Sequence, residues 1–105
     1  MDVIAERQLQ LRMDNGSIDV TVKIGRPELD SSGENWMCPY EIWFGDNCKS
    51  MAMHGVDSIQ ALQLTIATLD VELEYGARKR AGTLYHYDEP FTSILENSGL
   101  EVRKA

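Results

Sequence analysis

The chain of 105 residues carries 17 acidic and 10 basic side chains, which give it a formal net charge of −7. Its length suits a single domain, and a hydrophobic content of 43% is enough for a packed core. The acidic balance argues against direct nucleic-acid binding, because phosphate contacts need clustered lysine and arginine. No apolar run approaches the roughly 20 residues of a membrane-spanning helix, and no secretion signal follows Met1, so we expect a cytoplasmic protein without a membrane partner.

The N-terminal part of the chain predicts a β-hairpin. Apolar and polar residues alternate over Ala5–Met13 and again over Ile18–Ile24, which is the period of a half-buried strand. The Asn15-Gly16 pair between them supplies the positive φ angles that a tight turn needs. The two strands are therefore expected to pair directly with each other.

The following stretch predicts a loop and two further strands. Residues 25–35 are rich in glycine, proline, serine and aspartate, a composition typical of loops. Alternation resumes over Trp36–Phe44, where Pro39 cannot donate a ladder hydrogen bond and so indicates an edge or a bulge. After a short turn, Cys48–Met53 predicts a weaker strand with both of its methionines on one side.

The only long helix is expected over about residues 57–76. Asp57 suits the N-cap, and Gln60 follows three residues later, close to the capping-box pattern. Apolar residues then recur at spacings of three and four and predict one buried stripe, made of Ile59, Leu62, Ile66, Leu69 and Leu73. Gly76 offers a left-handed position at which the helix can end, although Ala77–Arg80 can extend it.

The C-terminal segment, 82–105, carries weaker signals. Leu84–Tyr87 is a candidate for a fifth short strand, and Phe91–Asn97 is a candidate for a short helix. The whole pattern predicts a single α+β domain over 1–105, in which an antiparallel four- to five-stranded meander sheet from about 4–54 is packed by one long helix. We expect this fold to have two layers.

Three segments, taken in order, resemble the motifs of one family. They are Ile24-Gly25-Arg26-Pro27, Trp36-Met37-Cys38-Pro39-Tyr40 and the helix start Gly55-Val56-Asp57-Ser58-Ile59-Gln60-Ala61-Leu62. The chain thereby resembles a family of small, mostly bacterial proteins described as a domain of unknown function, with IGRP, WxCPY and GVDSxQAL motifs. The resemblance covers roughly residues 5–75 and implies no activity, cofactor or catalytic residue.

Negative charge is concentrated in the middle of the chain. Residues 28–75 hold nine acidic side chains and a single basic one, Lys49, for a net charge of −8. The candidates for an acidic surface are Glu28, Asp30, Glu34, Asp46, Asp70, Glu72 and Glu74. Such a surface either serves solubility or docks a basic protein through fast, electrostatically steered association.

Two sets of apolar residues are candidates for partner binding. Leu64, Val71 and Tyr75 lie together on the helix, nearly opposite its predicted buried stripe. Either the C-terminal segment covers this second stripe, or a second copy or another protein does. Met37 and Trp43 point away from the predicted core face of their strand. Either the C-terminal segment or the opposite edge of the sheet covers them, or they bind a partner, since tryptophan is favoured at binding hot spots.

The cysteines and histidines give little indication of a metal site. The four candidate ligands lack the short paired spacings of zinc sites: Cys38, Cys48, His54 and His86. Nothing marks either cysteine as an activated nucleophile, so we expect two reduced thiols without a disulfide. We therefore predict no metal, no cofactor and no catalytic residue.

These observations favour a non-enzymatic protein-binding domain. Its concrete form is a small cytoplasmic inhibitor, of the immunity or phage counter-defence kind, that blocks a basic protein partner. The predicted partner-binding residues are Trp43, Met37, Glu34, Asp46, Asp70, Glu74, Leu64, Val71 and Tyr75. A structural homodimer or accessory subunit is the second hypothesis, and a small metal or thiol enzyme that uses Cys38, Cys48 and His54 is the third.

Overall fold

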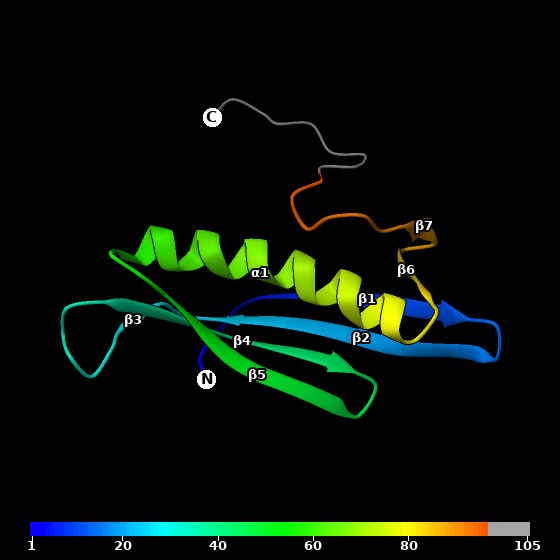
Figure 1. Cartoon of the computed structure of the whole chain (residues 1–105), viewed down its shortest axis with the longest axis horizontal. Coiled ribbons are helices and arrows are strands. Elements are labelled where there is room, and N and C mark those ends of the chain that lie inside the picture. The colour runs from blue at the N-terminus through cyan, green and yellow to red at the C-terminus, as the bar shows by residue number, and fades with distance from the viewer. Residues whose placement is uncertain (97–105) are drawn as a thin grey trace.

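One antiparallel sheet and one helix build the part of the protein that the structure describes. The computed structural model describes residues 1–96, in which a long helix lies on one face of a seven-stranded sheet (Figure 1). The elements are β1 (Val3–Met13), β2 (Gly16–Gly25), β3 (Glu28–Leu29), β4 (Trp36–Phe44), β5 (Asn47–Gly55), α1 (Ser58–Lys79), β6 (Thr83–His86) and β7 (Glu89–Pro90). The α+β class and the packing of one helix on an antiparallel sheet are confirmed.

The strand order combines a meander with a return to its first strand. β1, β2, β4 and β5 are neighbours in that order, β6 adds to the far edge of β1, and β7 pairs with β6. β5 pairs with β4 along the whole length of both strands, so β2 and β3 share the other edge of β4. The expected four to five strands are an undercount, because β3 and β7 have two residues each and show no alternation.

Pro39 lies where β4 changes its pairing partner. β2 pairs with β4 as far as Tyr40, and β3 takes over at Met37. The proline has no backbone N–H to donate, and it falls in the gap between these two ladders. On this side β4 has no strand partner at Pro39, which corresponds to the predicted edge, whereas the unbroken register with β5 shows no bulge there.

The core lies between α1 and the sheet. Alternate residues of β1, β2 and β4 project towards the helix and are almost fully buried, among them Leu11, Val20 and Ile42. Leu69 and Leu73 of α1 pack against them. Within the described residues, no helix is both long and apolar enough to span a membrane.

The helix begins as predicted and continues past Gly76 to Lys79, the extension that the sequence had left open. Asp57 is the N-cap, since its Oδ1 accepts a hydrogen bond from the Gln60 backbone N–H at 2.7 Å, while Gln60 Oε1 accepts one from the Val56 N–H at 2.8 Å. Gly76 does not end the helix. It is buried, and a Cβ at this position would collide with the ring of Phe44. Glycine is thus needed here for close helix–sheet packing and not for termination.

The buried face of α1 is rotated from the predicted stripe. The residues buried against the sheet are Ala61, Thr65, Leu69, Leu73, Gly76 and Ala77. Leu62 and Ile66 are only half-buried, and Ile59 is 67% exposed, so the prediction that Ile59 lies in the core is wrong. The physical reason is that small residues such as Ala61 let the helix approach the sheet closely. The predicted stripe included only large apolar residues, so it missed these small residues of the buried face.

The segment after β7 returns to the helix. Residues 91–96 form no helix, so the short helix predicted there is wrong for these residues, and its expected last residue, Asn97, lies outside the described part. Asp70 of α1 accepts hydrogen bonds from the Ile94 N–H at 2.7 Å and the Ser93 hydroxyl at 2.8 Å. Because Ile94 also packs against the core, the segment is held to one flank of the helix. The predicted fifth strand is present as β6.

Candidate protein-binding surfaces

The face of the sheet that points away from α1, which we call the open face, carries Met37 and Trp43. Tyr40 and Ile42, at even-numbered positions of β4, are buried under the helix. Successive side chains of a strand point to opposite faces, so the odd-numbered Met37 and Trp43 lie on the face away from the helix. Both side chains are half-buried. The helix and the segment after β7 lie together on the other side (Figure 1), so no helix of residues 1–96 covers the open face.

Trp43 is placed between β2 and β5 on the open face. It is in register with Thr21 of β2 and with Cys48 of β5. Its indole Nε1 donates a hydrogen bond to Glu41 Oε1 at 3.0 Å, and Lys23 lies directly across from Glu41 on β2. A large, oriented aromatic ring is thus held at the surface beside two opposite charges, an arrangement that suits a contact with another protein.

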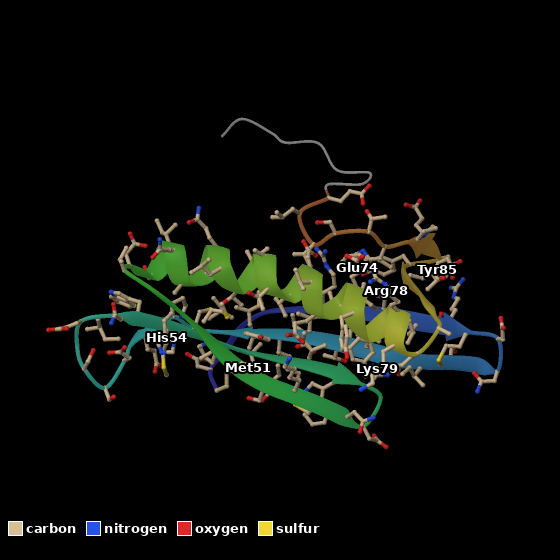
Figure 2. All side chains as sticks on the ribbon, in the orientation of Figure 1. Met51, His54, Glu74, Arg78, Lys79 and Tyr85 are labelled. Atoms are coloured by element: carbon tan, nitrogen blue, oxygen red, sulfur yellow. The ribbon has the colours of Figure 1, made fainter. Side chains whose placement is uncertain are left out.

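Tyr85 extends the open face towards the other end of the sheet. It lies on β6 in register with Gln10 of β1, and the guanidinium of Arg12 stacks on its ring at 4.0 Å. Arg12 also forms an ion pair with Asp88 at 2.5 Å. These contacts order the polar part of the open face (Tyr85 is labelled in Figure 2).

The second helix stripe predicted from the sequence is exposed. Leu64, Val71 and Tyr75 are 39, 68 and 62% exposed. The described part of the C-terminal segment lies at Asp70, and the helical repeat of about 100° per residue puts Asp70 about 140° away from Tyr75. By the same repeat Tyr75 lies only about 60° from Glu72, which contacts β5. Residues up to 96 therefore leave this stripe uncovered, on the β5 side of α1.

Met51 continues the stripe onto β5. It is in register with buried Tyr40, so its side chain is on the helix side of the sheet, and it is 48% exposed (Figure 2). Lys49, two residues earlier and on the same side, donates hydrogen bonds from Nζ to both Glu72 carboxylate oxygens at 2.7 and 2.8 Å. We call the surface formed by Met51, Leu64, Val71 and Tyr75 the apolar flank.

The predicted acidic residues do not form one surface. Asp70 accepts hydrogen bonds from the chain's own C-terminal segment, and Glu74 pairs with Arg78 at 2.5 Å (Figure 2). Glu34 and Asp46 precede and follow β4, whose nine residues separate them by about 30 Å. The nine predicted partner-binding residues are thus divided among the open face, the apolar flank, the opposite flank of α1 and two loops.

Cys38 and Cys48 lie on opposite faces of the sheet, and both are free thiols. Cys38 is buried, its Sγ–H donates to the Gly25 carbonyl at 3.5 Å, and burial raises the pKa of its thiol. Cys48 is exposed, and its pKa is raised by desolvation and then by the charge of Glu41. A raised pKa disfavours the reactive thiolate. Residues 1–96 contain no cluster of histidine, cysteine and acidic side chains suited to a metal ion.

A hollow of about 280 Å³ lies beside the apolar flank, between the end of α1 and the β4–β5 turn. Its lining includes Tyr75, Lys79 and Arg80. The Arg80 guanidinium stacks on the Phe44 ring at 4.2 Å, whereas Lys79 has no ion-pair partner in the described chain. This end of the apolar flank is therefore locally positive on a protein with negative net charge.

The sequence also matches a known family model. A domain of unknown function, DUF6968, matches residues 5–94. The chain belongs to the DUF6968 family. The match extends past the roughly 5–75 covered by the three motifs, as far as Ile94, so the DUF6968 domain includes the segment that returns to α1. No curated protein and no solved structure shows significant similarity to the chain.

One feature of this DUF6968 domain that the sequence pattern did not reveal is the free edge of β5. The spacing of its two methionines predicted that they share one face of the strand. The alternation of apolar and polar residues does not, however, show which strands lie beside β5 in the sheet. Only the pairing of β5 with β4 alone shows that its second edge is open in the described residues.

Proposed function

We propose that this DUF6968 chain is a non-enzymatic protein-binding domain that recognises a basic protein through the open face. The observation that carries the proposal is Trp43, an oriented and partly exposed tryptophan on a sheet face that no helix of residues 1–96 covers. Tryptophan is enriched among residues that dominate binding energy. Trp43 and Met37 would form the centre of the contact.

Charge supports a basic partner. The net charge of −7 attracts a positively charged protein over distances of about a Debye length, although the individual carboxylates are spread over the molecule. Long-range attraction depends on the total charge more than on one acidic patch, so the dispersal of Glu34 and Asp46 is compatible with it. A small cytoplasmic inhibitor of the immunity or phage counter-defence kind, in a bacterial or phage setting, would act in this way.

A photo-crosslinking experiment tests this proposal. A photo-reactive residue at Gln8, which is exposed and opposite Thr21 on β2, samples the open face, and the same residue at Gln63 on the exposed side of α1 is the matched control. In the producing cells we expect a basic protein to crosslink at Gln8 and not at Gln63. When the crosslinking is repeated in a lysate of these cells, raising the salt concentration should weaken the crosslink, because salt screens the attraction.

Two substitutions decide whether the crosslink depends on the open face. Trp43→Gln should reduce the crosslink at least about tenfold, as expected for a hot-spot residue. Thr21→Arg should reduce it as well, since it keeps the tryptophan but adds a positive charge that repels a basic partner. Circular dichroism checks that both variants are folded. An adduct that is equal at Gln8 and Gln63, or that survives both substitutions in folded protein, would contradict the proposal.

A structural homodimer is the second candidate function, and the apolar flank favours it. The geometry gives no support to the third hypothesis, an enzyme that uses Cys38, Cys48 and His54, because the two thiols lie on opposite faces of the sheet.

A further inference from the structure

β5 is an edge strand without the features that usually protect one. Its nine residues pair with β4 without a register shift, contain no proline, and leave the second edge unpaired within residues 1–96. Its single lysine, Lys49, is bound to Glu72 of the same chain. Natural edge strands are commonly blocked by proline, bulges or free charges, so an unblocked edge of this length can add another strand.

The apolar flank borders this free edge. Met51 projects from β5 on the helix side, and the exposed side chains of Leu64, Val71 and Tyr75 project from α1 towards the same side. A partner that pairs with β5 therefore also meets an apolar helix surface. The partner must offer both a strand edge and an apolar helix flank.

We propose that the partner is a second copy of the chain, with the two β5 strands paired antiparallel about a two-fold axis at Met51. A two-fold axis perpendicular to the sheet keeps both helices on the same face and makes them antiparallel. Paired strands lie about 4.8 Å apart, and α1 packs over β4 and β5, so each helix axis lies about 5 Å from the two-fold axis. The two helices are then about 10 Å apart, the distance at which helices pack.

The register of the helices follows from contacts within one chain. Lys49 lies against Glu72, and Gly55 lies so close to Ala61 that a Cβ on the glycine would be 2.5 Å from the Ala61 nitrogen. Between these two contacts, Met51 is alongside about position 68 of α1. An axis at Met51 therefore brings Leu64 of one copy next to Val71 and Tyr75 of the other. The exposed stripe becomes self-complementary.

Charges at the two ends of α1 also match in this arrangement. The same register places Asp57 beside Lys79 of the second copy, and Lys79 has no ion-pair partner within the described part of its own chain. Antiparallel helices also oppose their dipoles. Glu72, which lies between the apolar flank and β5, is paired with Lys49, and Glu74, three residues from Val71, is paired with Arg78, so two chains of charge −7 can approach here with little repulsion.

Analytical ultracentrifugation over a concentration series tests the dimer. We expect a reversible dimer that Val71→Lys weakens at least about tenfold, since the lysine would be buried against the second copy. Val71 is exposed in the single chain, so the substitution should leave the fold intact. Ile59→Lys, on an exposed position of α1 about 140° around the helix from Leu64, is the matched control and should leave the dimer unchanged.

A disulfide test reports the register directly. In a Cys48→Ser background, Met51→Cys should form an interchain disulfide on mild oxidation, because residues directly opposite in antiparallel strands have Cα atoms about 5 Å apart. Ser50→Cys should not, since it is offset from its own symmetry mate. A chain that stays monomeric at its highest soluble concentration, a dimer that tolerates Val71→Lys, or equal crosslinking at both positions would overturn the proposal. Trp43→Gln should not affect the dimer, which separates this test from that of the open face.

Discussion

At the scale of single residues, Tyr40 is the clearest exception to the rule that buried polar groups find a partner. The residue is 1% exposed under α1, and its hydroxyl has no hydrogen-bond partner among residues 1–96. Burial raises the pKa of the hydroxyl, and the negative charge of Glu72 raises it further, so the group stays protonated at neutral pH. An unsatisfied buried hydroxyl carries a desolvation cost that the folded state must bear.

Tyr40→Phe should therefore stabilise the protein. We expect the free energy of unfolding in urea to rise by about 1 kcal/mol, because the substitution removes the unpaired hydroxyl and keeps the ring. Tyr85→Phe, whose hydroxyl lies on the half-buried open face, is the control and should change stability by less than about 0.5 kcal/mol. A loss of stability in Tyr40→Phe would show that the hydroxyl has a partner in solution.

Single residues also show where sequence reasoning was limited. The roles of Asp57 and Gln60 could be predicted because a cap joins atoms three residues apart in the chain. The role of Gly76 could not, because its reason is the ring of Phe44, which is distant in the sequence. Both residue types can be read from the sequence, but only the contact between Asp57 and Gln60 is between residues close together in the chain.

At the scale of elements, α1 depends on its N-cap. The Asp57 carboxylate accepts the Gln60 N–H, and no acidic residue in the first turn provides a substitute. Of the four free N–H groups at the start of a helix, this side chain satisfies one. The helix is the whole second layer of the described fold, so its stability affects the domain.

Asp57→Ala should lower the free energy of unfolding by about 1 kcal/mol, the usual value of an N-cap. Asp57→Asn should recover most of this loss, because asparagine caps equally well without a charge. Asp46→Ala, which removes an exposed aspartate of the β4–β5 turn, is a matched control for the charge. Thermal melts followed by circular dichroism provide the measurement, and an unchanged melting temperature for Asp57→Ala would rule out the capping role.

At the scale of the whole molecule, Asp70 links segments that are far apart in the chain. Its two carboxylate oxygens accept hydrogen bonds from the Ser93 hydroxyl and the Ile94 N–H. From the sequence, Asp70 was predicted to bind a partner, because the sequence shows its charge but not its contacts with Ser93 and Ile94. The structure instead uses it to hold the segment that completes the DUF6968 domain.

Asp70→Ala should release this segment without unfolding the sheet. We expect amide hydrogen exchange at Ile94 to accelerate at least about tenfold, since the acceptor of its N–H is lost. Exchange in β1 and β2 should remain slow. Glu74→Ala, which removes an exposed ion pair with Arg78 on the same helix, is the control and should leave Ile94 protected. Equal exchange at Ile94 in the two variants would contradict this role of Asp70.

The sequence by itself determined the local features of the protein: the hairpin from Ala5 to Ile24, the strand at Trp36–Phe44, the capped helix and the α+β class. Each depends on a repeat or a contact that spans only a few residues, and such local patterns can be recognised directly in the amino-acid sequence. The tertiary structure decided the rest. It placed β5 at an open edge, rotated α1 so that Ile59 faces solvent, and dispersed the acidic residues, because pairing and packing between distant segments depend on the shape of the whole chain.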